Sequence, residues 1–136
     1  MRKTSVLIGI CMLAAVAFAL AAQGTTDLSP VMKDVAATQQ KMGMDFMAGS
    51  AADVAADAQK LAQDFTQAEG FFKAMKAQDA VDMAKANVDA AGEVMKAAKA
   101  NDLDTAKAKS KTIGGSCKAC HMVHREQLPD KTYKFK

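Results

Sequence analysis

Apolar and small residues recur at alternating spacings of three and four over most of the chain, which is the pattern of helices with one buried face. Four such segments run from Leu28 to Phe46, from Val54 to Phe72, from Val81 to Ala98 and from Leu103 to His124. No segment shows the period of two that predicts a strand, and the tail from Tyr133 to Lys136 is expected to fray. The pattern therefore predicts an all-α chain.

Residues that favour helix starts and stops separate the four segments. The expected starts are Ser29 before Pro30, Ser50 with Asp53 three residues on, Asp79 and Asp102. The expected stops are Gly49, Asn101 and Pro129, with Gly70 as a candidate early stop of the second helix. Because the connections are short, helices of about 20 residues predict an antiparallel up-down-up-down four-helix bundle.

The composition predicts one helical domain with a thin core. The chain has 136 residues, of which 29 are alanine and none is tryptophan. This length is typical of a single domain. A buried alanine side chain contributes on the order of 1 kcal/mol or less, so a group other than side chains is expected to fill part of the interior.

The charge balance argues against nucleic acid as a partner. The chain carries 18 basic and 15 acidic residues, a net charge of +3, which falls to +1 without Arg2 and Lys3. No stripe of lysine and arginine interleaved with aromatic residues is present to follow a phosphate backbone.

The first residues have the three parts of a secretory signal peptide. Met1-Arg2-Lys3 is basic, the run from Val6 to Leu20 is apolar, and Ala19-Leu20-Ala21 supplies the small residues of a cleavage site. We expect a cleaved signal peptide at residues 1–22, an exported periplasmic domain at residues 23–136 and no stable membrane insertion after cleavage. An uncleaved anchor is the alternative, although the apolar run is short for the roughly 20 residues that span a membrane.

The segment Cys117-Lys118-Ala119-Cys120-His121 has the C-x-x-C-H pattern of covalent haem attachment. Two thiols three residues apart on a helix lie on one face and can add to the two vinyl groups at one porphyrin edge. His121, one turn after Cys117, then directs its imidazole at the iron as the proximal ligand. Because both cysteines belong to the buried stripe of the fourth helix, we expect one haem c inside the bundle.

Two glycines precede the cysteine pair. Gly114 and Gly115 together cost the helix about 2 kcal/mol relative to alanine, and a flat ring lying against the backbone would explain them. A local kink is the alternative reason for the pair.

Three other interpretations of the cysteine and histidine cluster were considered. A zinc site that adds His124 would stretch its ligands over about 10 Å of one helix, an awkward span for a tetrahedral ion. A thioredoxin-like dithiol would require a strand-helix-strand unit that the pattern lacks. A simple disulfide would leave His121 without a role.

Met32 is the methionine that the bundle is expected to bring to the distal side of the iron. In an antiparallel bundle the start of the first helix lies level with the end of the fourth, where His121 is placed. Met42, Met44 and Met47 lie roughly 15 to 22 Å further along the axis. Met83 is near the same end but off the buried stripe of the third helix, and Met75 lies in the connection between the second and third helices. The alternative role for Met32 is a core side chain over an open iron site.

The antiparallel order also indicates which other residues lie at the same height along the bundle as the cysteine pair. Phe65, Phe72, Val81 and Ala84 are expected to supply the apolar walls. Arg125, one turn after His121, is expected either to neutralise a haem propionate or to lie solvated on the surface. His124, on the same helix as His121, is expected to be a partly exposed polar residue.

The segment from Ile113 to His121, with Arg125 four residues on, resembles the class II cytochromes c, the family of cytochrome c-prime and its six-coordinate relatives. The segment from Pro30 to Asp34 looks like the Met-Lys-acidic segment in the first helix of the six-coordinate branch. The resemblance covers the whole mature chain and implies a four-helix bundle with covalently bound haem, with Met32 as the distal ligand.

Two functions follow from this resemblance. The first is a non-enzymatic periplasmic electron carrier that exchanges electrons with redox partner proteins, with iron held by His121 and Met32. The second is a five-coordinate protein that binds nitric oxide or carbon monoxide for sensing or detoxification. A haem-free helical interaction module is a third class, and the family allows a homodimer.

Overall fold

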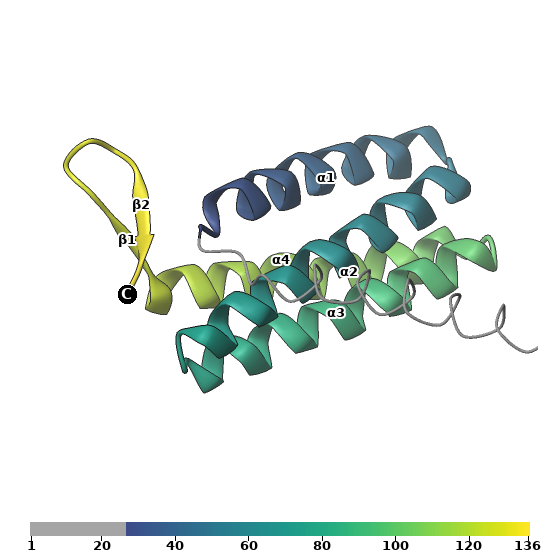
Figure 1. The fold of residues 1–136 in the computed structure, drawn as a ribbon. Helices are drawn as coiled ribbons and strands as arrows, with labels where there is room; N and C mark the ends of the chain where they lie inside the picture. The colour runs from purple at the N-terminus through teal and green to yellow at the C-terminus, as the bar shows by residue number, and fades with distance from the viewer. Residues whose placement is uncertain (1–26) are drawn as a thin grey trace, which may run out of the picture.

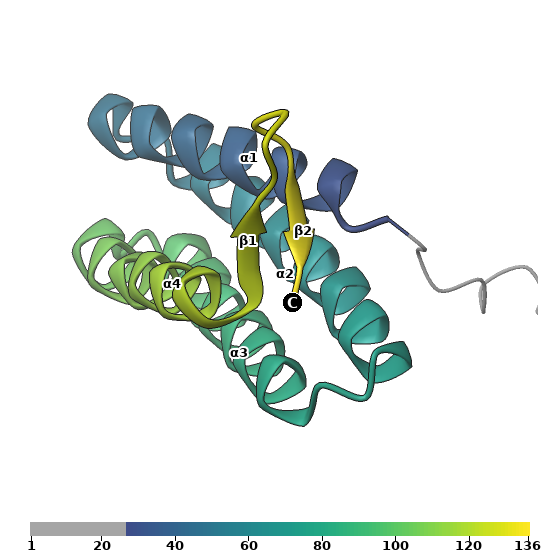
Figure 2. The same ribbon diagram turned by 90° about the vertical axis from the view of Figure 1, so that its left-hand side faces the viewer.

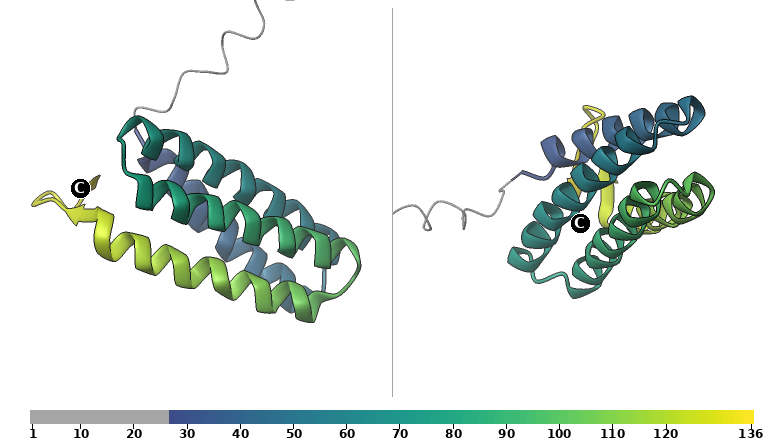
Figure 3. Two further views of the ribbon diagram at one scale, coloured as in Figure 1. Left: turned by 90° about the horizontal axis from the view of Figure 1, so that it is seen from below. Right: turned by 90° about the vertical axis from the view of Figure 1, so that its right-hand side faces the viewer.

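The computed structural model describes residues 27–136, and the predicted signal peptide lies outside them. The chain forms α1 (Ser29–Ala48), α2 (Ala51–Ala74), α3 (Gln78–Lys99) and α4 (Leu103–His124), followed by β1 (Arg125–Gln127) and β2 (Tyr133–Phe135). The helices pack against one another and alternate in direction (Figure 1; Figure 3). The predicted helical bundle is therefore confirmed. No helix among residues 27–136 is both long and apolar enough to cross a membrane.

Local signals explain three of the helix ends. Gly49 adopts a left-handed φ of 71° and closes α1, a conformation that glycine accepts without steric cost. The Asp102 carboxylate accepts a hydrogen bond from the Thr105 backbone N–H at 3.0 Å and begins α4. Ser29 is already the first residue of α1, and its backbone N–H is capped by the Asp27 carboxylate at 2.9 Å.

Two of the predicted helix ends are wrong. Gly70 does not stop α2, which continues to Ala74 because Phe71 and Phe72 are buried and hold the last turn against the core. Pro129 does not mark the end of α4, which stops five residues earlier at His124 because the chain turns there into β1.

The four helices do not contact one another equally. The contact between α2 and α3 is the most extensive, and α3 with α4 and α1 with α2 also pack closely, whereas α1 and α4 share few contacts. Figure 2 shows α1 and α4 on either side of the bundle end, with the strands between them. The start of α1, the end of α2, the start of α3 and the end of α4 all lie at this end (Figure 1). This arrangement confirms the prediction that the start of the first helix lies at the same end of the bundle as the end of the fourth.

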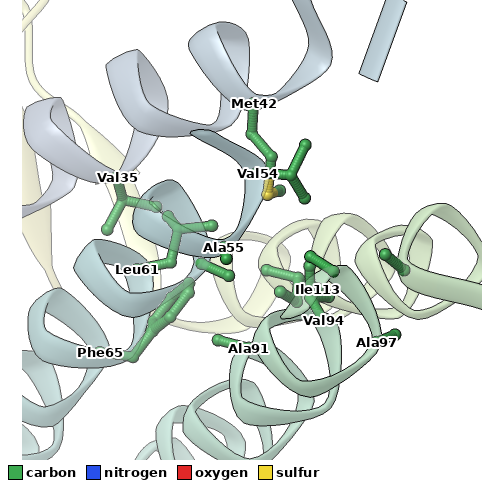
Figure 4. Close-up of a cluster of buried hydrophobic side chains, with 13 residues drawn as sticks. Val35, Met42, Val54, Ala55, Leu61, Phe65, Ala91, Val94, Ala97 and Ile113 are labelled. Carbon is green, nitrogen blue, oxygen red and sulfur yellow. The ribbon is translucent and has the colours of Figure 1, made fainter. Parts of the chain in front are cut away.

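The core has two parts. The central cluster draws on all four helices and is shown in Figure 4; it consists of Val35, Met42, Val54, Ala55, Ala58, Leu61, Phe65, Ala91, Val94, Ala97, Ala98, Ala106 and Ile113. The end cluster consists of Ala68, Phe71, Phe72, Ala80, Val81 and Ala84, with partly buried Leu28, Met32, Ala77 and Phe135 against it. No side chain of α4 belongs to the end cluster.

Charged residues support the contact between α1 and α2. Lys60 of α2 pairs with the exposed Asp34 of α1 at 3.3 Å and with the carboxylate of Asp64. Asp64 is 1% exposed, and its second oxygen, Oδ2, has no hydrogen-bond partner. An unpaired buried carboxylate is costly, so the single cation on Lys60 is important for this part of the bundle.

The C-terminal residues form an antiparallel hairpin, which corrects the prediction of a frayed tail and of no strand. Arg125 pairs with Phe135 and Gln127 with Tyr133 in register. The Asp130 carboxylate accepts a hydrogen bond from the Thr132 backbone N–H at 2.9 Å in the turn. The Phe135 side chain then packs against the end cluster. Strands of three residues are too short to show a period of two, so the hydrophobic pattern could not predict them.

Candidate functional site

The two predicted attachment cysteines lie on the inner side of α4. Cys117 and Cys120 are half-buried free thiols, and Cys117 packs against the central cluster. The Gln39 side-chain amide of α1 donates a hydrogen bond to Cys117 Sγ at 3.4 Å. This bond places the thiol of Cys117 on the side of α4 that faces α1.

Burial controls the ionisation of both thiols. It raises the pKa of Cys117 above its ordinary value, and it likewise raises the pKa of Cys120, where Cys117 and the Asp79 carboxylate add to the effect. Both groups are therefore protonated thiols near neutral pH. The pair is also unbridged in this structure, unlike the simple disulfide considered from the sequence.

His121 is a half-buried imidazole beside a cation. Burial lowers the pKa of His121 below its ordinary value, and the positive charge of Arg125 lowers it further. A metal ligand must be the neutral form of the ring. Arg125 Nη1 lies 3.4 Å from His121 Nδ1, and since a guanidinium can only donate, this contact favours the tautomer with an unprotonated Nδ1. Coordination through Nε2 would move the ring proton to Nδ1 and displace Arg125.

An open groove of about 510 Å³ borders His121. It is lined by Lys118, His121, Met122, Arg125, Gln127 and Tyr133. The Arg125 guanidinium lies 3.4 Å from the centre of the Tyr133 ring, a cation–π arrangement. Arg125 is thus exposed and held by the hairpin, which agrees with the surface alternative drawn from the sequence.

Met32 is brought to the same end of the bundle as the cysteine pair. It is partly buried against the end cluster, together with Phe72, Val81 and Ala84. Phe65 lies instead in the central cluster, against which Cys117 also packs. Phe65 shares that cluster with Leu61 and Ala91, whereas Met32 packs on the end cluster.

Among residues 27–136, no methionine other than Met32 packs on the end cluster. Met42 is buried in the central cluster, and Met44, Met47 and Met75 are at least half exposed. Met32 is therefore the methionine that packs on the end cluster.

The last turns of α4 contribute little to the protein core. Beyond Ile113, no residue of α4 is fully buried, and Met122 is 72% exposed. The apolar end cluster is built from α1, α2, α3 and the hairpin, while α4 brings thiols and an imidazole to this end. The donor set and the apolar surface fit a covalently attached haem, for which Cys117, Cys120 and His121 would be the residues that hold it.

The glycine pair has no packing partner within the protein. A Cβ atom added at Gly114 or Gly115 would meet no atom within 4 Å. The same is true of Gly43, Gly70 and Gly92. The open space at Gly114 and Gly115 is compatible with a ring lying there, and it does not distinguish the pair from the other glycines inside helices.

His124 has a structural role that the sequence did not reveal. Its Nε2 lies 2.8 Å from Asp79 Oδ2 at the start of α3, and its ring stacks on Phe135 with centres 5.0 Å apart. Its Nδ1 faces the carbonyl oxygen of Lys136 at 3.2 Å. His124 therefore joins α4 to α3 and to the hairpin. Asp79 is 45 positions away along the chain, and no local signal links the two residues.

No protein-family model, curated protein sequence or solved structure matches the chain. Among residues 27–136, no three side chains of histidine, cysteine, aspartate or glutamate are grouped so as to hold a metal ion. In particular, the Nε2 atom of His124 is directed to Asp79, so the four-ligand zinc arrangement has no geometric support.

Proposed function

We propose that the chain is an exported c-type cytochrome that carries electrons through one haem, bound covalently by Cys117 and Cys120. The observation that carries this proposal is the placement of both thiols and His121 in the last turns of α4, at the end of the bundle where the apolar end cluster includes no side chain of α4. When bound, the haem supplies an iron that changes between two oxidation states.

The residues of the chain have separate roles in this proposal. The two thiols would fix one edge of the ring to α4, which would hold the cofactor in place during electron transfer. His121 binds the iron as a neutral imidazole, a state that its lowered pKa favours. Met32 of α1 would supply a second iron ligand, and the apolar end cluster on which it packs would exclude water and so favour the less charged, reduced iron.

The test is a spectrum and a mass measured on protein exported from cells that carry haem-maturation enzymes. We expect the mass of one haem added to the mature chain and a low-spin spectrum. Cys117→Ser with Cys120→Ser should abolish the covalent haem. The proposal fails if the exported protein carries no haem that resists acid-acetone extraction.

Met32→Ala tests the distal ligand separately from haem attachment. We expect the spectrum to become high-spin in this variant, because the iron loses one axial sulfur. Met95→Ala is the matched control, since Met95 is a partly buried methionine on α3 that packs on the central cluster. Its spectrum should stay low-spin. A high-spin spectrum in the unmodified protein would favour the five-coordinate, gas-binding function over electron transfer.

A further inference from the structure

Charge is divided unevenly along the described chain. Residues 27–102 carry eight basic and twelve acidic side chains, a net charge of −4. Residues 103–136, which comprise α4 and the hairpin, carry eight basic and three acidic side chains, a net charge of +5. The part of the molecule that holds the cysteine pair is therefore its cationic part.

The cations are concentrated on one flank of α4. Lys107, Lys111 and Lys118 are spaced by four and seven residues, which places them on one face of a helix, and all three are exposed. Within residues 27–136 none of them forms an ion pair, whereas Lys109 on the other flank pairs with Glu93 of α3 at 2.9 Å. The charge of this row is not used to stabilise the fold.

The groove beside His121 continues this row. Lys118 and Arg125 contribute positive charge to the lining of the groove, and the exposed side chains of Met122 and Tyr133 form its apolar part. An apolar centre with a polar, charged rim is the usual composition of a protein–protein interface. We name the docking face as the set Lys107, Lys111, Lys118, Met122, Arg125 and Tyr133.

We propose that the docking face binds an acidic patch on the protein that gives electrons to the chain or takes them from it. The electron-exchange part rests on the proposed function, because His121 lines the same groove and docking there would bring the partner next to the proposed iron ligand. Complementary charge would speed the encounter and orient the partner. A membrane surface fits less well, since Met122, Val123 and Tyr133 are too few to form the continuous apolar face of an interfacial helix.

Calorimetric titration of the exported protein with a peptide of ten glutamates tests the docking face. Lys111→Glu with Lys118→Glu should weaken binding by about tenfold at low salt, because two favourable charge contacts become unfavourable. Lys96→Glu with Lys99→Glu is the matched control, since it makes the same change in net charge near the end of α3. The control should bind within about twofold of the unmodified protein, and binding should weaken as salt shortens the Debye length.

Three results would overturn the docking face. An equal loss in both variants would show that only net charge matters. No measurable binding at low salt would remove the site. Tighter binding to vesicles of equal parts phosphatidylglycerol and phosphatidylcholine, lost in the Lys111 and Lys118 variant, would assign the face to a membrane. Should circular dichroism show that this variant is unfolded, Lys107→Glu with Lys111→Glu changes the same row further from the cysteines and is interpreted in the same way.

Mass spectrometry of the same sample keeps the two proposals apart. If the protein lacks haem and the peptide still binds at the docking face, the proposed electron transfer fails and the acidic-partner site stands. If haem is present and binding is not confined to this face, the docking face alone fails.

Discussion

Phe135→Ala should lower the stability of the whole bundle, although the residue is next to the end of the chain. The Phe135 ring is partly buried against the end cluster. Its centre lies 5.2 Å from that of Phe72, 5.8 Å from that of Phe71 and 5.0 Å from that of His124. The substitution removes all of these contacts at once.

The expected loss is about 2 kcal/mol. Truncation of a fully buried phenylalanine costs about 3 to 5 kcal/mol, and Phe135 is only partly buried, so about half of this range applies. Each aromatic pair contributes only about 0.5 to 1.5 kcal/mol. The expected loss of about 2 kcal/mol already includes the contacts with Phe71 and His124. A domain of this size has a total stability of about 5 to 15 kcal/mol, so the loss is easily measured.

Urea denaturation of the cofactor-free protein, followed by helical circular dichroism, measures the loss. The midpoint should fall while the slope stays nearly constant, because the surface exposed on unfolding changes little. Tyr133→Ala is the control in the same strand: its ring is 46% exposed and contacts Arg125 rather than the end cluster. It should cost less than about 1 kcal/mol. Equal losses for the two variants, or a loss below about 0.5 kcal/mol for Phe135→Ala, would refute the docking of the hairpin onto the core.

Three further changes test separate parts of the structure. Lys60→Met should destabilise the protein by about 2 kcal/mol in urea denaturation, because it leaves the buried Asp64 carboxylate without its cation; the figure is below that for a fully buried pair because Lys60 is 43% exposed. Gly114→Ala should stabilise the cofactor-free protein by about 1 kcal/mol, since the added Cβ meets no atom within 4 Å, and calorimetry should show a smaller gain in haem-loaded protein if the ring lies there. Asp79→Asn should reduce the acid sensitivity of folding, because the hydrogen bond from His124 lowers the pKa of Asp79 below its ordinary value of 3.8. The stability that the Asp79 carboxylate supplies is therefore fully present above pH 3.8 and is lost as the pH falls through the lowered pKa. Unfolding measured at pH 5 and at pH 3 should show this difference.

Each of these changes has a control or a contrary outcome. Lys85→Met breaks an ion pair that is exposed on both sides and should cost less than about 0.5 kcal/mol; a similar loss for Lys60→Met would contradict the role given to Asp64. Gly92→Ala also meets no atom within 4 Å and should gain equally with and without haem. If Asp79→Asn leaves the acid dependence unchanged, the His124 contact does not contribute to stability.

The sequence was sufficient for the helices because their boundaries depend on local chemistry. Gly49 and Asp102 act at helix ends through conformations and hydrogen bonds within a few residues. Gly70 misled the prediction because a glycine only weakens a helix, and the burial of Phe71 and Phe72 outweighs that weakening. The helical periodicity also placed Met32 and the cysteine pair at one end of the bundle, since an antiparallel order fixes the levels.

The hairpin and the contacts of His124 could not be predicted for the opposite reason. They depend on residues far apart in the chain, such as Asp79 with His124 and Phe71 with Phe135. A strand of three residues gains its stability from the surface that it packs on rather than from its own pattern. The division of the core into two clusters could not be predicted either, because periodicity gives the buried face of α2 and does not give the angle at which α2 crosses its neighbours.

The division of the core into two clusters has a consequence for local opening. The central cluster joins all four helices and can keep the bundle assembled by itself, whereas the last turns of α4 are held mainly by α3 and by the hairpin. Amide hydrogens in these turns should therefore exchange with solvent through small openings that leave the rest of the protein intact. Both cysteines lie in these turns, so an enzyme that modifies them would gain access through such an opening without unfolding the bundle.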